Sequence, residues 1–204
     1  MKRKNSQHSK IKAERLEVRN ESSEEHPVVL GVDPGTLVTG YGVVTSGING
    51  LQLLACGSIS NSPRLPMSAR LNRIHTELSH IIELYKPGEF AIESAFYGKN
   101  AQSALKLGHA RGVLILAAAH AGLPVSEYTP REIKKAVTGN GNASKPQIRF
   151  MVHSLIRLRK TSMNLDTADA IATAICHLQR LNRHKQSSRD WKSFVALHPE
   201  RVVT

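Results

Sequence analysis

Four acidic residues that are far apart in the chain are the best candidates for chemistry. Asp33 ends the apolar run Val28–Val32, and Glu93 ends the short apolar segment FAIE. Asp166 and Asp169 lie three residues apart in LDTADAIATAI, on one face of the first turn of a predicted helix. Asp169 has alanine and isoleucine as chain neighbours, a poor environment for an unpaired charge unless it faces a cleft. We therefore predict that the four acids face one site.

Three of these acids also have a purely structural interpretation. Asp33 precedes a Pro-Gly pair and can serve as a turn residue, and Glu93 can leave a sheet into solvent. Asp166 is favoured near a helix start by the helix dipole. Yet from residue 27 onward the chain has 11 acidic and 21 basic residues, and three of its four aspartates belong to this set. That shared placement favours a functional cluster.

Clustered carboxylates need a positive partner. Two of them 4 Å apart repel by about 1–4 kcal/mol, depending on the local dielectric. Hard divalent cations with oxygen ligands offset this repulsion, and Mg²⁺ binds through few carboxylates while taking phosphate oxygens as further ligands. Two such ions about 3.5–4 Å apart can activate water and stabilise the leaving oxygen of a phosphodiester. The acids therefore predict a Mg²⁺-dependent phosphodiester hydrolase.

The charge of the chain indicates a polyanionic partner. Its formal net charge is +12 and its pI about 10.1. Between Glu132 and Asp166 no acidic residue occurs, while seven basic ones do: Lys134, Lys135, Lys145, Arg149, Arg157, Arg159 and Lys160. Such a block can neutralise phosphates and makes affinity salt-sensitive. With only 4% aromatic residues, the chain does not fit a single-strand binder built on base stacking.

The length of 204 residues fits one domain with tails. Residues 1–26 are polar and aperiodic and are predicted to be a disordered extension, 27–182 to be the nuclease domain, and 183–204 to be a C-terminal tail. No apolar run reaches the roughly 20 residues of a membrane helix, and no signal peptide is recognisable. Cys56 and Cys176 lie in apolar segments and are expected to be reduced thiols, which fits a cytoplasmic protein.

The elements that must position the acids follow from hydrophobic periodicity and turn residues. Strands are predicted at 28–32, 39–46, 51–60, 90–93 and 125–128. Helices are predicted at 71–85, 100–120, from a capping box at Thr129, from Ser144 as a cap, and at 165–181. This order predicts an α/β domain in which helices pack on the faces of one mixed sheet.

Four blocks of the sequence resemble the RuvC family of Holliday-junction resolvases, which have an RNase H-like fold. GVDPGTLVTGYGVV resembles the family's first strand and hairpin, and FAIESAFYGKNAQSALKLGHARGV its second acidic block with the following helix. REIKKAVTGNGNASKPQI resembles its basic loop region, and DTADAIATAICH its final acidic helix. The resemblance spans residues 28–177, whereas the 26 residues before it have no counterpart in the family pattern.

The resemblance implies specific roles. The family's catalytic, metal-binding tetrad falls on the four acids named above, with about two Mg²⁺ per site and Mn²⁺ able to substitute. Phe96 matches an aromatic residue that probes the junction centre, and Lys134 and Lys145 match basic residues near the scissile phosphate. Phe96 also has the interpretation of a loop residue packed on the core, and the lysines that of a solvated face. Further residues expected to bind DNA are Lys106, Arg111 and Arg149.

The resemblance also implies partners and products. It predicts a homodimer with helix 100–120 at the interface, paired symmetric nicks in four-way DNA junctions, and ligatable ends with 5′-phosphates. It further implies a role in recombination and repair beside the branch-migration proteins RuvA and RuvB.

Two other functions remain open from the sequence. A ribonuclease acting on RNA–DNA hybrids would use the same kind of carboxylate cluster. A non-catalytic junction-binding clamp is also conceivable, although a binder of polyanions gains nothing from clustered negative charge. Cleavage assays on hybrid and junction substrates side by side, with and without Mg²⁺, distinguish the junction nuclease, the ribonuclease and the clamp.

Overall fold

The computed structural model describes residues 26–47, 50–94, 101–156 and 164–197, with side chains as far as Arg183. The strands are β1 (Val28–Asp33), β2 (Val38–Gly47), β3 (Gly50–Ser60), β4 (Glu89–Glu93) and β5 (Val125–Tyr128). The helices are α1 (Met67–Tyr85), α2 (Ala101–His120), α3 (Pro130–Thr138), α4 (Lys145–Ile156) and α5 (Leu165–Leu197). Each predicted strand and helix is present, with ends shifted by a few residues except at α5.

The sheet has the strand order β3-β2-β1-β4-β5. β1, β2 and β3 form an antiparallel meander, whereas β4 and β5 run parallel to β1. The parallel strands are reached through α1 and α2, as parallel connections require a crossover. The prediction of one mixed sheet with helices on its faces is confirmed.

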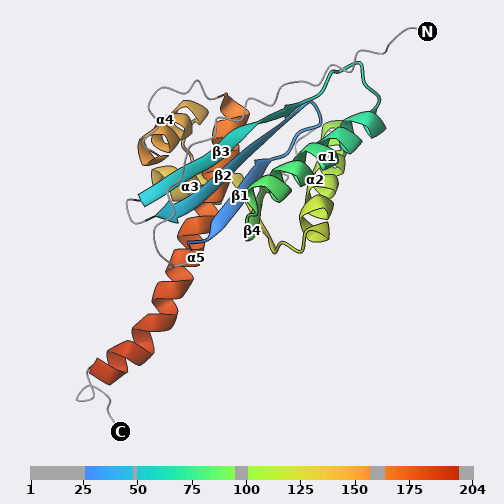
Figure 1. Ribbon diagram of the computed structural model, residues 1–204. Coiled ribbons are helices and arrows are strands. Elements are labelled where there is room, and N and C mark those ends of the chain that lie inside the picture. The colour runs from blue at the N-terminus through green and yellow to red at the C-terminus, as the bar shows by residue number, and fades with distance from the viewer. Residues whose placement is uncertain (1–25, 48–49, 95–100, 157–163, 198–204) are drawn as a thin grey trace.

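Successive residues of the central strands face opposite layers. Leu30, Val32, Phe90 and Ile92 are fully buried against α1 and α2, whereas Val29 and Ala91 face α3, α4 and α5. Figure 1 shows these layers on the two sides of the sheet. Because both faces are covered, the strands read as nearly continuous apolar runs.

Glycines let α5 approach the sheet at backbone distance. A Cβ on Gly31 of β1 would collide with the carbonyl oxygen of Ala170, and one on Gly40 of β2 with that of Asp166. Gly42 lies against Ile171 in the same way. The missing side chains therefore set how deeply α5 packs, because any other residue would push the helix away.

Local caps fix where two helices begin. The predicted capping box is confirmed: the Thr129 side chain accepts from the Glu132 backbone N–H, and the Glu132 carboxylate accepts from that of Thr129. At the start of α5, the Asn164 side chain accepts a hydrogen bond of 2.8 Å from the Thr167 N–H. This cap puts Asp166 in the first turn of α5.

A buried hydrogen-bond chain ties α5 to two strands. Nε2–H of His177 donates to the Glu89 carboxylate at 3.2 Å, and its Nδ1 accepts from the Tyr128 hydroxyl at 2.7 Å. Burial lowers the pKa of His177, which keeps the ring neutral near pH 7. These bonds supply partners for the buried Tyr128 and His177 side chains, whereas the Glu89 side chain is 26% exposed and lies at the margin of the core layer between α5 and the sheet.

The predicted end of the last helix, at residue 181, is wrong. α5 continues to Leu197 and extends away from the sheet (Figure 1). The apolar periodicity stops because this part of the helix leaves the core, but no glycine or proline occurs between residues 181 and 197 to end it. The predicted N-terminal extension lies outside the described residues apart from His26. Within the described chain no helix has the length and apolarity to span a membrane.

Candidate active site

The ends of two adjacent parallel strands bring the first two acids together. β1 and β4 pair in parallel up to Val32 and Ile92, and the next residues are Asp33 and Glu93. Carboxyl ends of parallel strands meet at one edge of a sheet, and this is where ligands bind in open α/β sheets. The two carboxylates therefore lie side by side at that edge.

The first turn of α5 brings the other two acids to the same edge. Gly40 pairs with Asp33 across β1 and β2, and the carbonyl of Asp166 fills the space beside Gly40. Asp169 follows one helical turn later, and its carboxylate is 14% exposed. Four acids predicted from the sequence thus gather at one end of β1.

Burial and mutual repulsion change the acidity of the strand carboxylates. Burial raises the pKa of Asp33 to about 8, helped by the negative charges of Glu93, Asp169 and Asp166. The pKa of Glu93 is also raised, first by burial and then by Asp169. Near neutral pH such a cluster holds a proton unless a cation replaces it, which is typical of functional sites.

Two lysines supply positive charge to the cluster. Lys145 Nζ donates a hydrogen bond of 2.9 Å to the Asp169 carboxylate, and this bond raises the pKa of Lys145. The positive charge of Lys145 lowers the pKa of both Asp33 and Glu93, and that of Lys134 lowers the pKa of Glu93. Lys145 therefore contacts the acids directly, and the charge of Lys134 acts on Glu93.

The donor set fits a hard divalent cation. In the part of the chain that the structure describes, no three His, Cys, Asp or Glu side chains are already gathered tightly enough to hold an ion. Asp169 instead pairs with the Lys145 ammonium group, which takes the place of a cation. The four acids offer only oxygen ligands, and the raised pKa values of Asp33 and Glu93 show that negative charge in the cluster is costly, a cost that a bound Mg²⁺ would offset.

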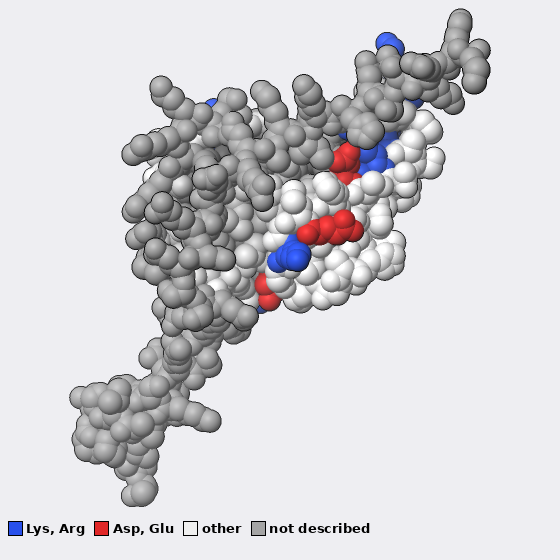
Figure 2. All heavy atoms as spheres, viewed as in Figure 1, with Lys and Arg blue, Asp and Glu red and all other residues white. Residues whose placement is uncertain are grey.

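The remaining predicted DNA contacts are spread over other elements. Lys106 is exposed on α2, and Arg149 is exposed on α4 four residues after Lys145. Arg111 is engaged within the chain: its guanidinium bonds to the backbone carbonyl of Glu93 and to Glu127. Phe96 lies outside the described residues. Among the described side chains visible in Figure 2, acidic and basic residues lie next to one another.

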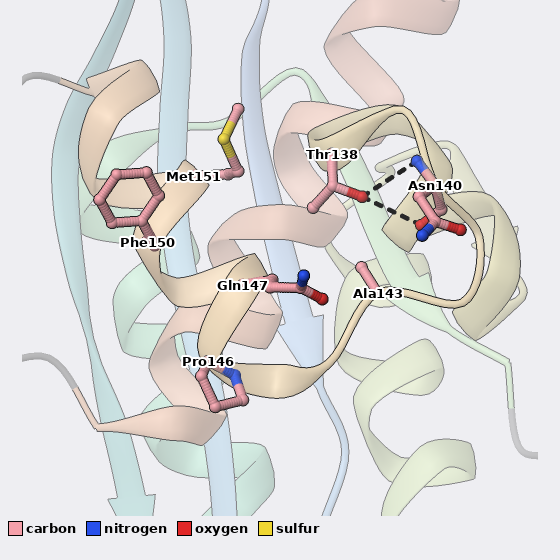
Figure 3. A pocket seen from close by; sticks show the side chains of 7 residues that line it. All are labelled: Thr138, Asn140, Ala143, Pro146, Gln147, Phe150 and Met151. Atoms are coloured by element: carbon pink, nitrogen blue, oxygen red, sulfur yellow. Dashed lines mark hydrogen bonds between the residues drawn. The ribbon is translucent and has the colours of Figure 1, made fainter.

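A hollow of about 520 Å³ lies between the end of α3 and α4 (Figure 3). Thr138 and Asn140 form one wall of this hollow, and Gln147 and Phe150 line the other. None of the four acids lines it, so the candidate active site is the open edge at the end of β1 and not this hollow.

A family model described as "Crossover junction endodeoxyribonuclease RuvC" matches residues 29–177, which include all four acids. The chain belongs to the RuvC family. It is 44% identical to the RuvC of Chlorobium phaeovibrioides over 188 residues, covering 86% of this chain and 100% of the relative. It is also 44% identical to the RuvC of Salinibacter ruber, covering 86% of this chain and 98% of the relative.

Solved structures give the same family assignment. Thermus thermophilus RuvC in complex with a Holliday junction substrate aligns with a TM-score of 0.70 at 35% identity, covering 74% of this chain and 93% of that one. The yeast mitochondrial resolvase Ydc2 aligns with a TM-score of 0.61 at 15% identity, which shows a shared fold only. The RNase H-like fold expected from the RuvC resemblance is confirmed, and the chain is a crossover junction endodeoxyribonuclease by family.

Sequence reasoning missed two features of this site. The glycines at 31 and 40 were visible inside strands, a signal of close backbone approach, but the sequence does not say what approaches. The bond from Arg111 to the Glu93 carbonyl joins residues 18 apart and leaves no pattern in the chain.

Proposed function

We propose that this protein is a Mg²⁺-dependent, structure-selective endodeoxyribonuclease that resolves four-way DNA junctions by paired symmetric nicks. The observation that carries the proposal is the gathering of Asp33, Glu93, Asp166 and Asp169 at one sheet edge, beside two lysines. The relatives named as crossover junction endodeoxyribonucleases, and a neighbour solved with a Holliday junction, support the substrate.

The four carboxylates are the catalytic and metal-binding residues of the proposal. These residues would hold Mg²⁺, expected as a pair of ions and replaceable by Mn²⁺, which would supply an activated water and stabilise the leaving oxygen. Asp33 lies within the electrostatic reach of the other three acids, so its carboxylate would help to hold both ions. Hydrolysis leaves a 5′-phosphate and a 3′-hydroxyl.

The basic residues of the proposal hold the DNA backbone. Lys145 neutralises the cluster through Asp169 and is 59% exposed, so it can also contact the scissile phosphate. Lys134 lies near Glu93 and contacts the same DNA strand as Lys145. Lys106 and Arg149 bind phosphates further from the cut site. Phe96 probes the junction centre in this proposal.

We further propose a two-fold homodimer formed through α2. Leu105 and Leu116 of α2 are 63% and 48% exposed, and both are large apolar side chains. Leu114 and Ala118 are buried on the opposite side against α1, so α2 has apolar residues on both sides. A two-fold dimer places two identical sites against two strands of like polarity, which yields symmetric nicks.

The cellular setting follows from the substrate. We propose that the dimer acts in the cytoplasm, in homologous recombination and DNA repair, beside the branch-migration proteins RuvA and RuvB. The two cysteines of the described chain form no disulfide, which is compatible with a reducing compartment.

A cleavage assay on a synthetic four-way junction tests the proposal. The wild-type protein should nick the junction symmetrically in Mg²⁺, and Asp33→Asn should abolish cleavage while binding stays equal or becomes tighter, because a negative charge near phosphate is lost. Full cleavage by this variant would contradict the site assignment.

The same assay separates the two rival functions. An RNA–DNA hybrid of matched length, cut faster than the junction, would point to a ribonuclease. Absence of any turnover across a Mg²⁺ titration, with junction binding intact, would point to a non-catalytic clamp.

A further inference from the structure

Arg111 on α2 links two strand ends at the active-site edge. Its Nη1 donates a hydrogen bond of 2.9 Å to the backbone carbonyl oxygen of Glu93, and its Nη2 lies 2.5 Å from the Glu127 carboxylate. The Arg111 side chain is 14% exposed, whereas that of Glu127 is 49% exposed. The guanidinium is therefore largely enclosed, and two of its nitrogens have partners within the protein.

The Glu93 carbonyl lies just beyond the point where β4 stops pairing with β1. The β1–β4 ladder ends at the Val32–Ile92 pair, one residue before Glu93. On the other side, β5 still pairs with Glu93 through Tyr128, whose carbonyl accepts from the Ser94 N–H at 2.7 Å. Arg111 therefore supplies a hydrogen bond to β4 just beyond the last pair with β1, at the residue whose side chain belongs to the acidic cluster.

We propose that Arg111 is a positioning residue for the reaction rather than a DNA contact. By holding the Glu93 carbonyl and Glu127 together, it fixes the end of β4 and with it the Glu93 carboxylate against Asp33. Groups that hold metal ligands in place tune metal affinity, and their loss costs about 10–100-fold. The inference rests on the proposed nuclease function, because it concerns how that site binds Mg²⁺.

The position of Arg111 on α2 gives the link a second consequence. α2 is the helix proposed to form the dimer, and Arg111 lies between its exposed Leu105 and Leu116 in the chain. A rigid bidentate guanidinium can transmit the placement of α2 to the strand end, which a single ammonium group does less well.

The test measures Mg²⁺ dependence and DNA affinity separately on the full-length protein. Single-turnover cleavage of a four-way junction at saturating enzyme gives the Mg²⁺ midpoint, and junction binding without Mg²⁺, at several salt concentrations, gives the affinity and its salt slope. The variants are Arg111→Gln, Arg111→Lys, Glu127→Gln and the Gln double variant. Lys106→Gln serves as the comparison for a DNA contact, because it removes an exposed cation, proposed to bind phosphate, from the same helix.

Positioning predicts a shifted metal midpoint. Arg111→Gln should raise the Mg²⁺ midpoint about tenfold with unchanged junction affinity. Arg111→Lys should recover part of the loss, since an ammonium group can still donate to one acceptor. Glu127→Gln should shift the midpoint in the same direction by less, and the double variant should resemble Arg111→Gln because both residues act in one link. Lys106→Gln should weaken junction binding, as expected for a phosphate contact, and leave the Mg²⁺ midpoint unchanged.

The opposite pattern overturns the inference. If Arg111 binds phosphate, Arg111→Gln weakens junction binding and lowers the salt slope of that binding, while the Mg²⁺ midpoint stays constant. In that case Glu127→Gln tightens junction binding, because it removes a negative charge that competes with phosphate for Arg111. An unchanged midpoint with fewer active molecules would mean that Arg111 only stabilises the fold. Failure of the wild-type protein to cleave would count against the proposed function and not against this inference.

Discussion

The carbonyl oxygen of Asp166 occupies the space that a Cβ on Gly40 would fill. Gly40 is also the β2 partner of Asp33. Because Gly40 has no side chain, the first turn of α5, which carries Asp166, can pack next to Asp33. The close packing of α5 on the sheet therefore shapes the candidate active site as well as the core.

Gly40→Ala should displace the first turn of α5, because the new methyl group meets backbone that cannot rotate away. We expect a loss of stability of about 1–3 kcal/mol, the usual cost of overpacking. Junction cleavage should fall at least about tenfold, since misplacement of a catalytic group by about 1 Å can cost about 100-fold. Thermal melting and single-turnover cleavage check this, with Gly88→Ala as control because a Cβ there meets no atom within 4 Å. Equal activity of both variants would refute the packing argument.

The metal-free protein should lose stability as the pH rises from about 4 to about 8. The pKa of Asp33 lies near its ordinary value of 3.8 in the unfolded chain and at about 8 in the folded one. Within this window the folded state binds more protons, so its advantage disappears as the pH climbs. Melting temperatures measured in EDTA should therefore fall with pH, and Asp33→Asn should melt higher and show a flatter profile. A variant that melts below the wild type at pH 8 would contradict this reasoning.

Lys145→Gln should weaken cleavage at neutral pH more than it weakens folding. Its positive charge lowers the pKa of Asp33 and Glu93, so its loss raises both and shifts the rising limb of the pH–rate profile at limiting Mg²⁺ to higher pH. The stability change should stay below about 1 kcal/mol, because the lysine is 59% exposed and its pair with Asp169 is screened by water. Lys135→Gln, an exposed lysine of α3, is the control and should leave the profile in place.

Leu116→Glu should convert the proposed dimer into monomers. A charge placed in the centre of an apolar two-fold interface is buried twice, once from each copy. Leu84→Glu is the matched control, because Leu84 is 55% exposed on α1 and lies outside the proposed interface. Light scattering after size-exclusion chromatography gives the mass of each variant. A wild-type monomer, or a Leu116→Glu dimer, would refute the interface.

Much of the fold could be predicted from the sequence because the residues that start and end its helices and strands act locally. Pro34-Gly35 turns the chain between β1 and β2, and the Thr129 capping box starts α3, as each pattern predicts. The acids could be singled out because charged residues are rare at the ends of apolar segments. The end of α5 was misjudged because periodicity reports packing, and a helix that leaves the core no longer shows it.

The amino-acid sequence alone determined the α/β class, the strand and helix order and the identity of the four acids. Those features depend on residue types and on spacings within single elements. Only the tertiary structure decided that Gly40 admits α5 beside Asp33, that Lys145 pairs with Asp169, and that Arg111 holds Glu93. Each of these contacts joins residues from different elements, so it depends on how the layers pack and not on any pattern along the chain.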